Sequence, residues 1–202
     1  MATTTLLLDL DGVVRFFDAD AQAEVERRHS LEPGRIAAIA VDPELMGPLV
    51  IGRLTRAAWV AEIGRRLGDA EAAAAWTGVD AHLDHELLAE VDRLRAAGVT
   101  VAILTNGTDT VADEVAALDL PRRVDAIFNS AELGVAKPDR RAFAIVCERL
   151  GVEPAEVFFT DDSPSKLTGA RELGMTAEPY TGLPAFRGHL RACGLHPRPE
   201  PS

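Results

Sequence analysis

Acidic side chains gather at two places in the chain, each directly after a run of apolar residues. Asp9 and Asp11 end the stretch LLLDLD, and Asp161 and Asp162 follow the stretch VFFT. A carboxylate beside buried apolar residues is costly unless it is paired or bound to a cation. If these carboxylates meet, they call for a hard cation. Because no His or Cys clusters with them, the residue types favour Mg²⁺ over zinc as the cofactor.

Three further residues could act beside such a metal site. Thr105 and Asn106 follow the apolar run VAIL, and Lys137 directly precedes Pro138. Each has an ordinary alternative, since Thr and Asn commonly cap helices after strands and a lysine is usually a solvated surface charge. Beside an acidic metal cluster, however, a lysine is a cation that can hold phosphate oxygens.

Four short apolar runs are predicted to be the strands that position these residues. They are near-continuous rather than alternating, which is typical of strands covered on both faces. They span residues 5–8, 99–104, 124–128 and 157–159. Helical patterns accompany them at about residues 84–97, 108–118, 139–150 and 163–173. This alternation predicts an α/β fold, a Rossmann-like parallel sheet with helices on both faces.

The four aspartates, Thr105 and Asn106 all follow the carboxyl ends of predicted strands. In a parallel sheet these ends share one edge, and ligands bind in the crevice beyond it. We therefore expect the four aspartates to meet Thr105 and Asn106 at one rim of the sheet.

Composition and charge argue against several classes of protein. The chain has 202 residues, with 21 Lys and Arg against 32 Asp and Glu, for a formal net charge of −11. The basic residues are scattered, which argues against nucleic acid or an anionic membrane surface as a partner. No apolar stretch approaches the roughly 18 residues that cross a bilayer. With no signal-peptide pattern and no metal-ligand spacing at Cys147 and Cys193, we expect a cytoplasmic location, and the sequence indicates no protein partner.

In this order, the polar segments resemble the four motifs of the haloacid dehalogenase superfamily of hydrolases. The matching stretches are DLDGV at residues 9–13, LTN at 104–106, KP at 137–138 and FFTDDSP at 158–164. Any one match is weak, but four in order, in these strand contexts, are highly specific.

A helical insertion separates the first predicted strand from the helix near residue 84. Its helical patterns lie near residues 18–29, 33–40, 43–50, 55–67 and 69–76, with no strand signal between them. The insertion resembles the small α-helical cap that the phosphatase and dehalogenase branch carries after its first motif. We therefore expect a core of residues 1–14 and 84–195, a cap of residues 15–83 and a disordered tail of residues 196–202.

The resemblance implies a role for each matched residue. Asp9 would be the nucleophile that becomes an aspartyl-phosphate, and Asp11 would be the general acid and base. Thr105, Asn106 and Lys137 would hold the transferring phosphoryl oxygens.

Metal and substrate contacts extend this set. The resemblance implies that Mg²⁺ binds the side chains of Asp9 and Asp162 and the backbone carbonyl of Asp11. Asp161 would offset locally the positive charge of Lys166. Arg15 and Arg53 are weaker candidates for the substrate entrance.

These roles predict a Mg²⁺-dependent phosphatase, a phosphoric monoester hydrolase acting on small phosphorylated metabolites. Dehalogenase members, as the resemblance goes, lack an acid at the position of Asp11, because a departing halide needs no proton. A phosphomutase similar to β-phosphoglucomutase is the nearest alternative, and a requirement for a phosphorylated-sugar activator would distinguish it. A non-catalytic binding or regulatory protein with this fold is a further alternative.

Lys166 is the one departure from the motifs and the only support for a non-catalytic protein. An Asn or Asp commonly stands four residues after the second aspartate of the last motif, where this chain has Lys166. A lysine that faced the site would oppose a divalent cation. Because its long stem can carry the charge to solvent, we expect Lys166 to point away from the metal.

Overall fold

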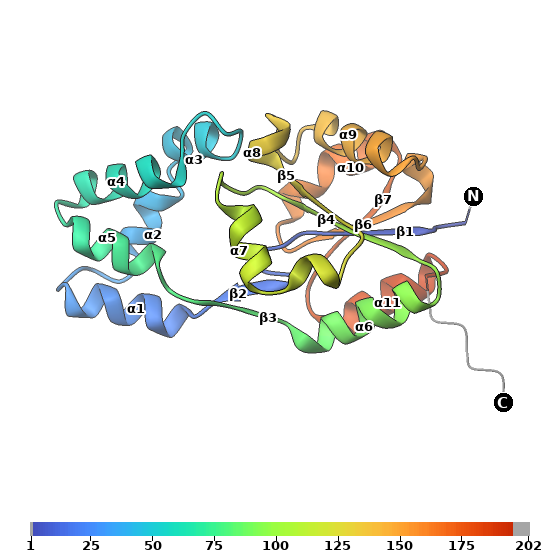
Figure 1. The fold of residues 1–202 in the computed structure, drawn as a ribbon, viewed down its shortest axis with the longest axis horizontal. Coiled ribbons are helices and arrows are strands. Elements are labelled where there is room, and N and C mark those ends of the chain that lie inside the picture. Colours follow the sequence, from blue (N-terminus) through green and yellow to red (C-terminus); the bar gives the residue numbers. More distant parts are fainter. Residues whose placement is uncertain (1, 196–202) are drawn as a thin grey trace.

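The core of the molecule is a five-stranded parallel sheet (Figure 1). The structure is a computed structural model and describes residues 2–195. The strand order is β5-β4-β1-β6-β7. Its strands are β1 (Thr5–Leu8), β4 (Thr100–Thr105), β5 (Ala126–Asn129), β6 (Val157–Asp161) and β7 (Thr176–Pro179). The predicted α/β fold and the four predicted strands are confirmed, whereas the predicted tail, residues 196–202, lies outside the described residues.

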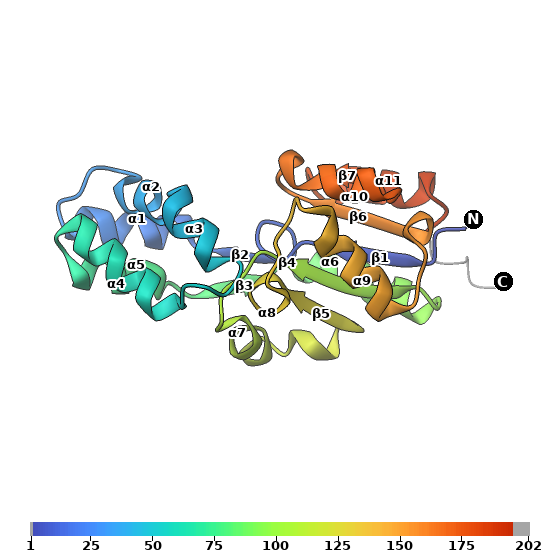
Figure 2. The same ribbon diagram turned by 90° about the horizontal axis from the view of Figure 1, so that it is seen from above.

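Helices cover both faces of this sheet (Figures 1 and 2). They are α6 (His85–Ala96), α7 (Val111–Ala117), α8 (Ser130–Leu133), α9 (Arg140–Leu150), α10 (Thr168–Leu173) and α11 (Leu183–Ala192). Short 3₁₀ turns are η1 (Leu120–Arg122), η2 (Pro154–Glu156) and η3 (Pro164–Leu167). The predicted helix over residues 163–173 is thus divided into η3 and α10.

Strand β1 lies at the centre of the sheet, and its side chains pack into two hydrophobic clusters, one on each face. Successive side chains of a strand point to opposite faces. Leu6 and Leu8 pack with residues of α6 and α11, and Leu7 packs with residues of α9 and α10. All four residues of β1 are buried, so Asp9 begins where a fully covered strand ends.

Five helices between β1 and α6 form a separate group, the helical lobe (Figure 2). They are α1 (Ala19–Arg28), α2 (Arg35–Ala40), α3 (Pro43–Leu49), α4 (Arg56–Leu67) and α5 (Ala70–Thr77). The lobe has its own hydrophobic cluster, which includes Ile36, Leu45 and Ile63. The division of the chain into a core and a cap at residues 14, 15, 83 and 84 stays a prediction.

Two short strands join the helical lobe to the sheet and correct the expectation that this insertion holds no strand. β2 (Arg15–Phe17) and β3 (Ala81–Leu83) pair antiparallel, with Phe16 opposite His82. Three residues are too few to establish an alternating pattern, so hydrophobic periodicity does not predict these two strands. Strand β7 and helices α8 and α11 are likewise not predicted from the sequence. β7 reads TAEP, with only Ala177 buried, as suits an edge strand.

Among the described residues, no helix is both long and apolar enough to span a membrane.

Truncating the central strand should destabilise the fold. Leu7 is fully buried, so Leu7→Ala is expected to lower the free energy of unfolding by about 2–5 kcal/mol through lost apolar burial and a residual cavity. Urea unfolding followed by circular dichroism measures this change. The control is Val41→Ala, because Val41 is 64% exposed and its truncation should change stability by less than about 0.5 kcal/mol. Equal losses in the two variants would contradict the assigned core.

Candidate active site

Two neighbouring strands place the first two carboxylates side by side. β1 and β6 run parallel with Leu8 paired to Thr160, and the Asp9 N–H donates to the Thr160 carbonyl at 2.9 Å. The next residue of β6 is Asp161, so Asp9 and Asp161 lie at the same rim of the sheet. The predicted meeting of the two acidic segments is therefore present.

A single buried lysine bridges these carboxylates. Lys137 Nζ lies 2.7 Å from Asp9 Oδ1 and 2.6 Å from Asp161 Oδ2. The Lys137 side chain is only 1% exposed, and the Asp161 side chain is fully buried. Lys137 Nζ also lies 5.4 Å from the centre of the Phe159 ring. Lys137 is thus an internal ion-pair partner and not a solvated surface charge.

The cluster carries more negative than positive charge. Lys137 faces two buried carboxylates and Asp162 adds a third nearby, so the three carboxylates outnumber the ammonium groups even when the neighbouring Lys166 is counted. Burial raises the pKa of Asp9 to about 7, with Lys137 opposing the shift and Asp161 adding to it. Burial, and then the charge of Asp161, also raise the pKa of Asp162. A cation placed here would supply the missing positive charge.

The three carboxylates fit a hard divalent cation. Asp9, Asp161 and Asp162 each offer an oxygen, and these oxygens lie within 4.8 Å of one another. An all-carboxylate donor set suits Mg²⁺. Gly12 allows the Asp162 side chain to lie close to the backbone that follows Asp11. A Cβ at residue 12 would lie 2.3 Å from Asp162 Oδ2, and the φ of +83° at Gly12 disfavours other residues.

Asp11 is held apart from this triad by Arg15. Arg15 Nε and Nη2 donate to the two Asp11 oxygens at 2.6 and 3.0 Å, and Nη1 donates to Glu114 Oε2 at 2.8 Å. The Arg15 side chain is 4% exposed, whereas that of Asp11 is 42% exposed. Arg15 also lines the cavity described below, and its guanidinium fixes the Asp11 carboxylate; its contact with a substrate stays a prediction.

Asn106 is committed to the backbone of Lys137. Its Oδ1 accepts from the Lys137 N–H and its Nδ2 donates to the Lys137 carbonyl, both at 2.8 Å. This pair of bonds holds the segment that carries the buried ammonium. Thr105 ends β4 and is buried beside it. Direct contacts of Thr105 and Asn106 with phosphate stay predictions.

The expectation that Lys166 points away from the site is wrong. Lys166 lies in the 3₁₀ turn η3, is partly buried, and its Nζ donates to the Lys137 carbonyl at 3.4 Å. Burial, followed by the charge of Lys137, lowers the pKa of Lys166. Its side chain turns inward because that carbonyl offers an acceptor within reach. Lys137 and Lys166 are the two lysines of the chain, so both lie at this site.

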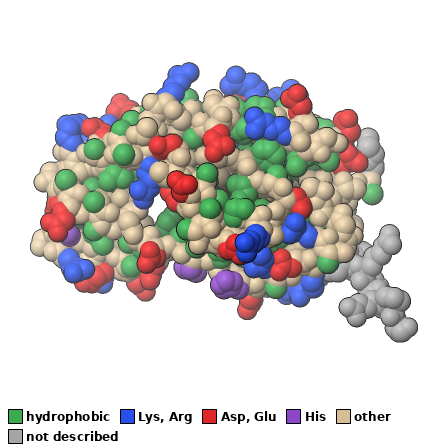
Figure 3. Space-filling model, in the orientation of Figure 1, with side chains coloured by type: hydrophobic (Ala, Val, Ile, Leu, Met, Phe, Trp, Pro, Cys, Tyr) green, Lys and Arg blue, Asp and Glu red, His purple; other side chains and the backbone are tan. Residues whose placement is uncertain are grey.

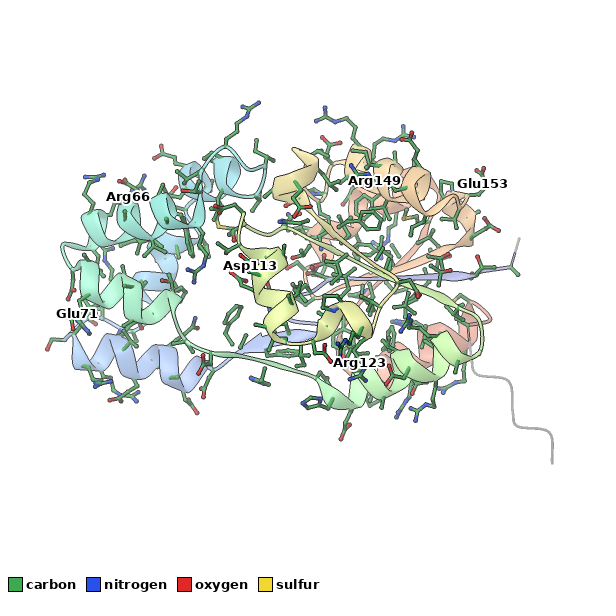
Figure 4. All side chains as sticks on the ribbon, viewed as in Figure 1. Arg66, Glu71, Asp113, Arg123, Arg149 and Glu153 are labelled. Carbon is green, nitrogen blue, oxygen red and sulfur yellow. The ribbon has the colours of Figure 1, made fainter. Side chains whose placement is uncertain are left out.

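A cavity of about 670 Å³ opens beside Asp11, between the helical lobe and the sheet. Figure 3 shows this hollow, and Figure 4 labels Asp113 of α7 at its edge. Asp11, Arg15 and Asn106 line it, whereas Arg53 is exposed elsewhere. Among residues 2–195, Arg53 is not in the cavity lining, so its contact with a substrate stays a prediction.

Glu114 and Arg56, which are not predicted from the sequence, tie the helical lobe to Arg15. Glu114 of α7 accepts from Arg15 and also lies 3.6 Å from Arg56 Nε of α4. The Arg56 N–H donates to Asp109 Oδ1 at 2.7 Å. Arg15 and Glu114 are 99 residues apart in the chain, and helix periodicity alone gave no signal for this contact.

Mg²⁺ should bind the carboxylate triad. Asp162→Asn is expected to weaken Mg²⁺ binding by roughly tenfold or more, because it removes one of three negative charges from the ion's surroundings. Calorimetric titration of the metal-free protein measures the affinity directly. Asp20→Asn, an exposed change on α1, is the control and should bind Mg²⁺ as the unaltered chain does. Equal affinities in both variants would remove Asp162 from the metal site.

The inward Lys166 should weaken that binding. Lys166→Met is expected to tighten Mg²⁺ binding, by roughly tenfold, because it removes a positive charge from the cluster while keeping an apolar stem. The same titration tests this, with thermal unfolding of both proteins to show equal folding. Unchanged or weaker binding would mean that the Lys166 charge does not act on the ion.

Known proteins similar to this chain include dehalogenases and phosphatases. (S)-2-Haloacid dehalogenase 4A of Burkholderia cepacia is 38% identical over 85 residues, which are 42% of this chain and 37% of that protein. The chain therefore spans well under half the length of this relative. A phosphatase of Mycobacterium tuberculosis is 28% identical over 200 residues, covering 88% of this chain and 87% of that protein.

The fold and the family model agree with this grouping. A solved haloacid dehalogenase family enzyme of Bacteroides thetaiotaomicron superposes with a TM-score of 0.74 at 24% identity, covering 91% of this chain and 96% of that one. A model of the haloacid dehalogenase-like hydrolases matches residues 3–174. That span contains the whole carboxylate triad, Lys137 and the helical lobe. The chain belongs to the haloacid dehalogenase-like hydrolase family.

Proposed function

We propose that this hydrolase is a Mg²⁺-dependent phosphatase that cleaves phosphate monoesters through an aspartyl-phosphate on Asp9. The observation that carries the proposal is the carboxylate of Asp11, which stands two residues after Asp9 and is fixed by Arg15 on the cavity wall. An alkoxide leaving group needs a proton, and an oriented carboxyl on the cavity wall can supply it.

In the first step, a carboxylate oxygen of Asp9 attacks phosphorus and the bond to the ester oxygen breaks. For this step Asp11 must hold a proton in place of one of its two hydrogen bonds from Arg15, and it gives that proton to the departing alkoxide. In the second step, water attacks the aspartyl-phosphate while Asp11 takes a proton from it, which releases inorganic phosphate and restores Asp9.

Lys137 and the metal ion would both stabilise the negative charge on the phosphoryl oxygens. The Lys137 ammonium already contacts Asp9, so it is placed to neutralise phosphoryl oxygens bound there. Mg²⁺ held by Asp9 and Asp162, with Asp161 beside them, would draw charge from the same oxygens. Asn106 keeps the Lys137 segment in position throughout.

The relatives support the proposed phosphatase activity, but some of them are dehalogenases. The M. tuberculosis relative that covers most of the chain is a phosphatase, and one solved Bacteroides structure is a complex with magnesium and inorganic phosphate. Dehalogenases are also among the relatives, and their chemistry is the second candidate. Asp11 favours the phosphatase, because a departing halide has no need of an acid. Release of chloride from 2-chloropropionate, with no phosphate ester cleaved, would favour the dehalogenase.

Asp9→Asn should abolish phosphate release while leaving the fold intact, because a neutral amide does not form an acyl phosphate. Hydrolysis of p-nitrophenyl phosphate with Mg²⁺ measures the loss, and Asp20→Asn is the matched control. Mass spectrometry of acid-quenched protein after incubation with acetyl phosphate should find the phosphoryl group on Asp9. Undiminished turnover by Asp9→Asn would remove this residue from the mechanism.

Lys137→Ala should lower kcat/KM by roughly 10²–10³-fold, equivalent to about 2.7–4 kcal/mol, the usual cost of removing one donor to a transition-state oxyanion. Arg140→Ala, which removes an exposed cation three residues away, should have little effect. Steady-state kinetics on the same ester, with unfolding curves for both variants, gives the comparison. A fall of less than about tenfold in a folded Lys137→Ala protein would limit Lys137 to a structural role.

A further inference from the structure

The cavity beside Asp11 is much larger than a phosphate group needs. Its volume of about 670 Å³ falls within the range of roughly 300–1,000 Å³ typical of sites for small organic ligands. The lining includes Asp11 and Asn106 but not the buried Asp9 and Lys137. An ester whose phosphoryl group reaches Asp9 would therefore leave its alcohol portion in this cavity.

The wall that faces this alcohol portion is mainly apolar. The helical lobe contributes Met46 and Leu49 of α3, Trp59 of α4 and Trp76 of α5. The Trp59 Nε1 donates to the Ala40 carbonyl at 3.1 Å, so its polar atom is satisfied within the lobe. The rest of the ring then offers carbon surface to a ligand.

Exposed apolar residues converge on the same cavity. Among the described residues, the large hydrophobic side chains that stand exposed are Phe17, at 40%, and Val41, at 64%. Both line the cavity, although one comes from β2 and the other follows α2. Exposed apolar surface around a hollow marks a site that a ligand covers.

The charged groups of the cavity disfavour a second anionic group on the ligand. Arg15 is paired with Asp11 and Glu114, and Arg56 lies against Glu114 and donates to the Thr77 carbonyl. The two lining arginines are therefore occupied within the protein. Further charge on the lining comes from Asp80 and Asp113, which are acidic and exposed. A sugar bisphosphate or a phosphorylated dicarboxylate would meet repulsion here.

We propose that the preferred substrates are monophosphate esters of hydrophobic alcohols, whose uncharged apolar portion fills the cavity between Phe17, Val41 and the two tryptophans. This proposal rests on the phosphatase function and extends it to the substrate class. Polyhydroxylated sugars are disfavoured, because their hydroxyl groups would lose water against a mainly apolar wall.

A series of primary alkyl phosphates tests the proposal. Ethyl, butyl and octyl phosphate release primary alkoxides of nearly the same basicity, so differences in kcat/KM report burial of the substrate's alkyl chain. Each buried methylene is expected to raise kcat/KM by up to about fourfold, and octyl phosphate should exceed butyl phosphate by roughly tenfold or more. Glucose 6-phosphate should be cleaved less efficiently than octyl phosphate. Equal kcat/KM values across the series would overturn the proposal.

Two variants that each add a carboxylate test whether the preference for long alkyl chains arises in this cavity. Val41→Asp places a carboxylate on the cavity wall and should reduce the preference for octyl over ethyl phosphate by roughly fivefold or more. Ala61→Asp is the matched control, because Ala61 is an exposed residue of α4 outside the lining. It should leave the preference unchanged. Equal effects of the two variants would place the apolar selectivity elsewhere and overturn the proposed site.

A binding measurement separates this proposal from the proposed function. The chain has two tryptophans, Trp59 and Trp76, and both line the cavity, so their fluorescence reports directly on a ligand there. In the Asp9→Asn protein, affinity for alkyl phosphates should rise with chain length. Rising affinity without turnover of any ester by the unaltered protein would support the apolar site and contradict the phosphatase. Turnover with affinity independent of chain length would contradict the apolar site alone.

Discussion

The buried ammonium of Lys137 is the interaction on which the rest of this site depends. It pairs with Asp9 and Asp161, which end two neighbouring strands of the central sheet. Buried carboxylates this close repel one another and are expensive to desolvate. Without the lysine, the edge of the sheet would carry an uncompensated cluster of negative charge. Even with Lys137 and the nearby Lys166, three carboxylates face two ammonium groups, and this deficit of positive charge suits the site to a divalent cation.

Several features of the fold exist to keep that ammonium in place. The parallel register of β1 and β6 sets Asp9 beside Asp161. Asn106, at the end of β4, holds the backbone of Lys137 with two hydrogen bonds. Asp11 stands slightly apart, oriented by Arg15, which in turn meets Glu114 and, through it, Arg56 of the helical lobe. The groups proposed for proton transfer and for charge neutralisation are thus fixed by different partners.

Residues whose position follows from local pattern could be predicted from the sequence. Asp9 and Asp161 could be predicted because carboxylates at the ends of apolar runs must meet partners. Lys137 could be predicted because it precedes Pro138 in a chain with such an acidic cluster and matches the third motif. β2 and β3 were missed because three residues establish no period, and β7 because an edge strand needs little apolar surface. The direction of Lys166 depended on a carbonyl that another segment supplies. The pairing of Arg15 with Glu114 likewise joins segments 99 residues apart, which no local pattern records.

The most direct test of the central claim is a crystal structure of this protein grown with Mg²⁺ and beryllium fluoride, a mimic of the phosphoryl group. The account predicts beryllium bonded to a carboxylate oxygen of Asp9, fluorines facing Lys137, and the metal ion contacting Asp9 and Asp162. A structure in which Lys137 still bridges Asp9 and Asp161, with neither beryllium nor metal bound at saturating concentrations, would contradict it. The lysine would then be a structural ion-pair partner alone.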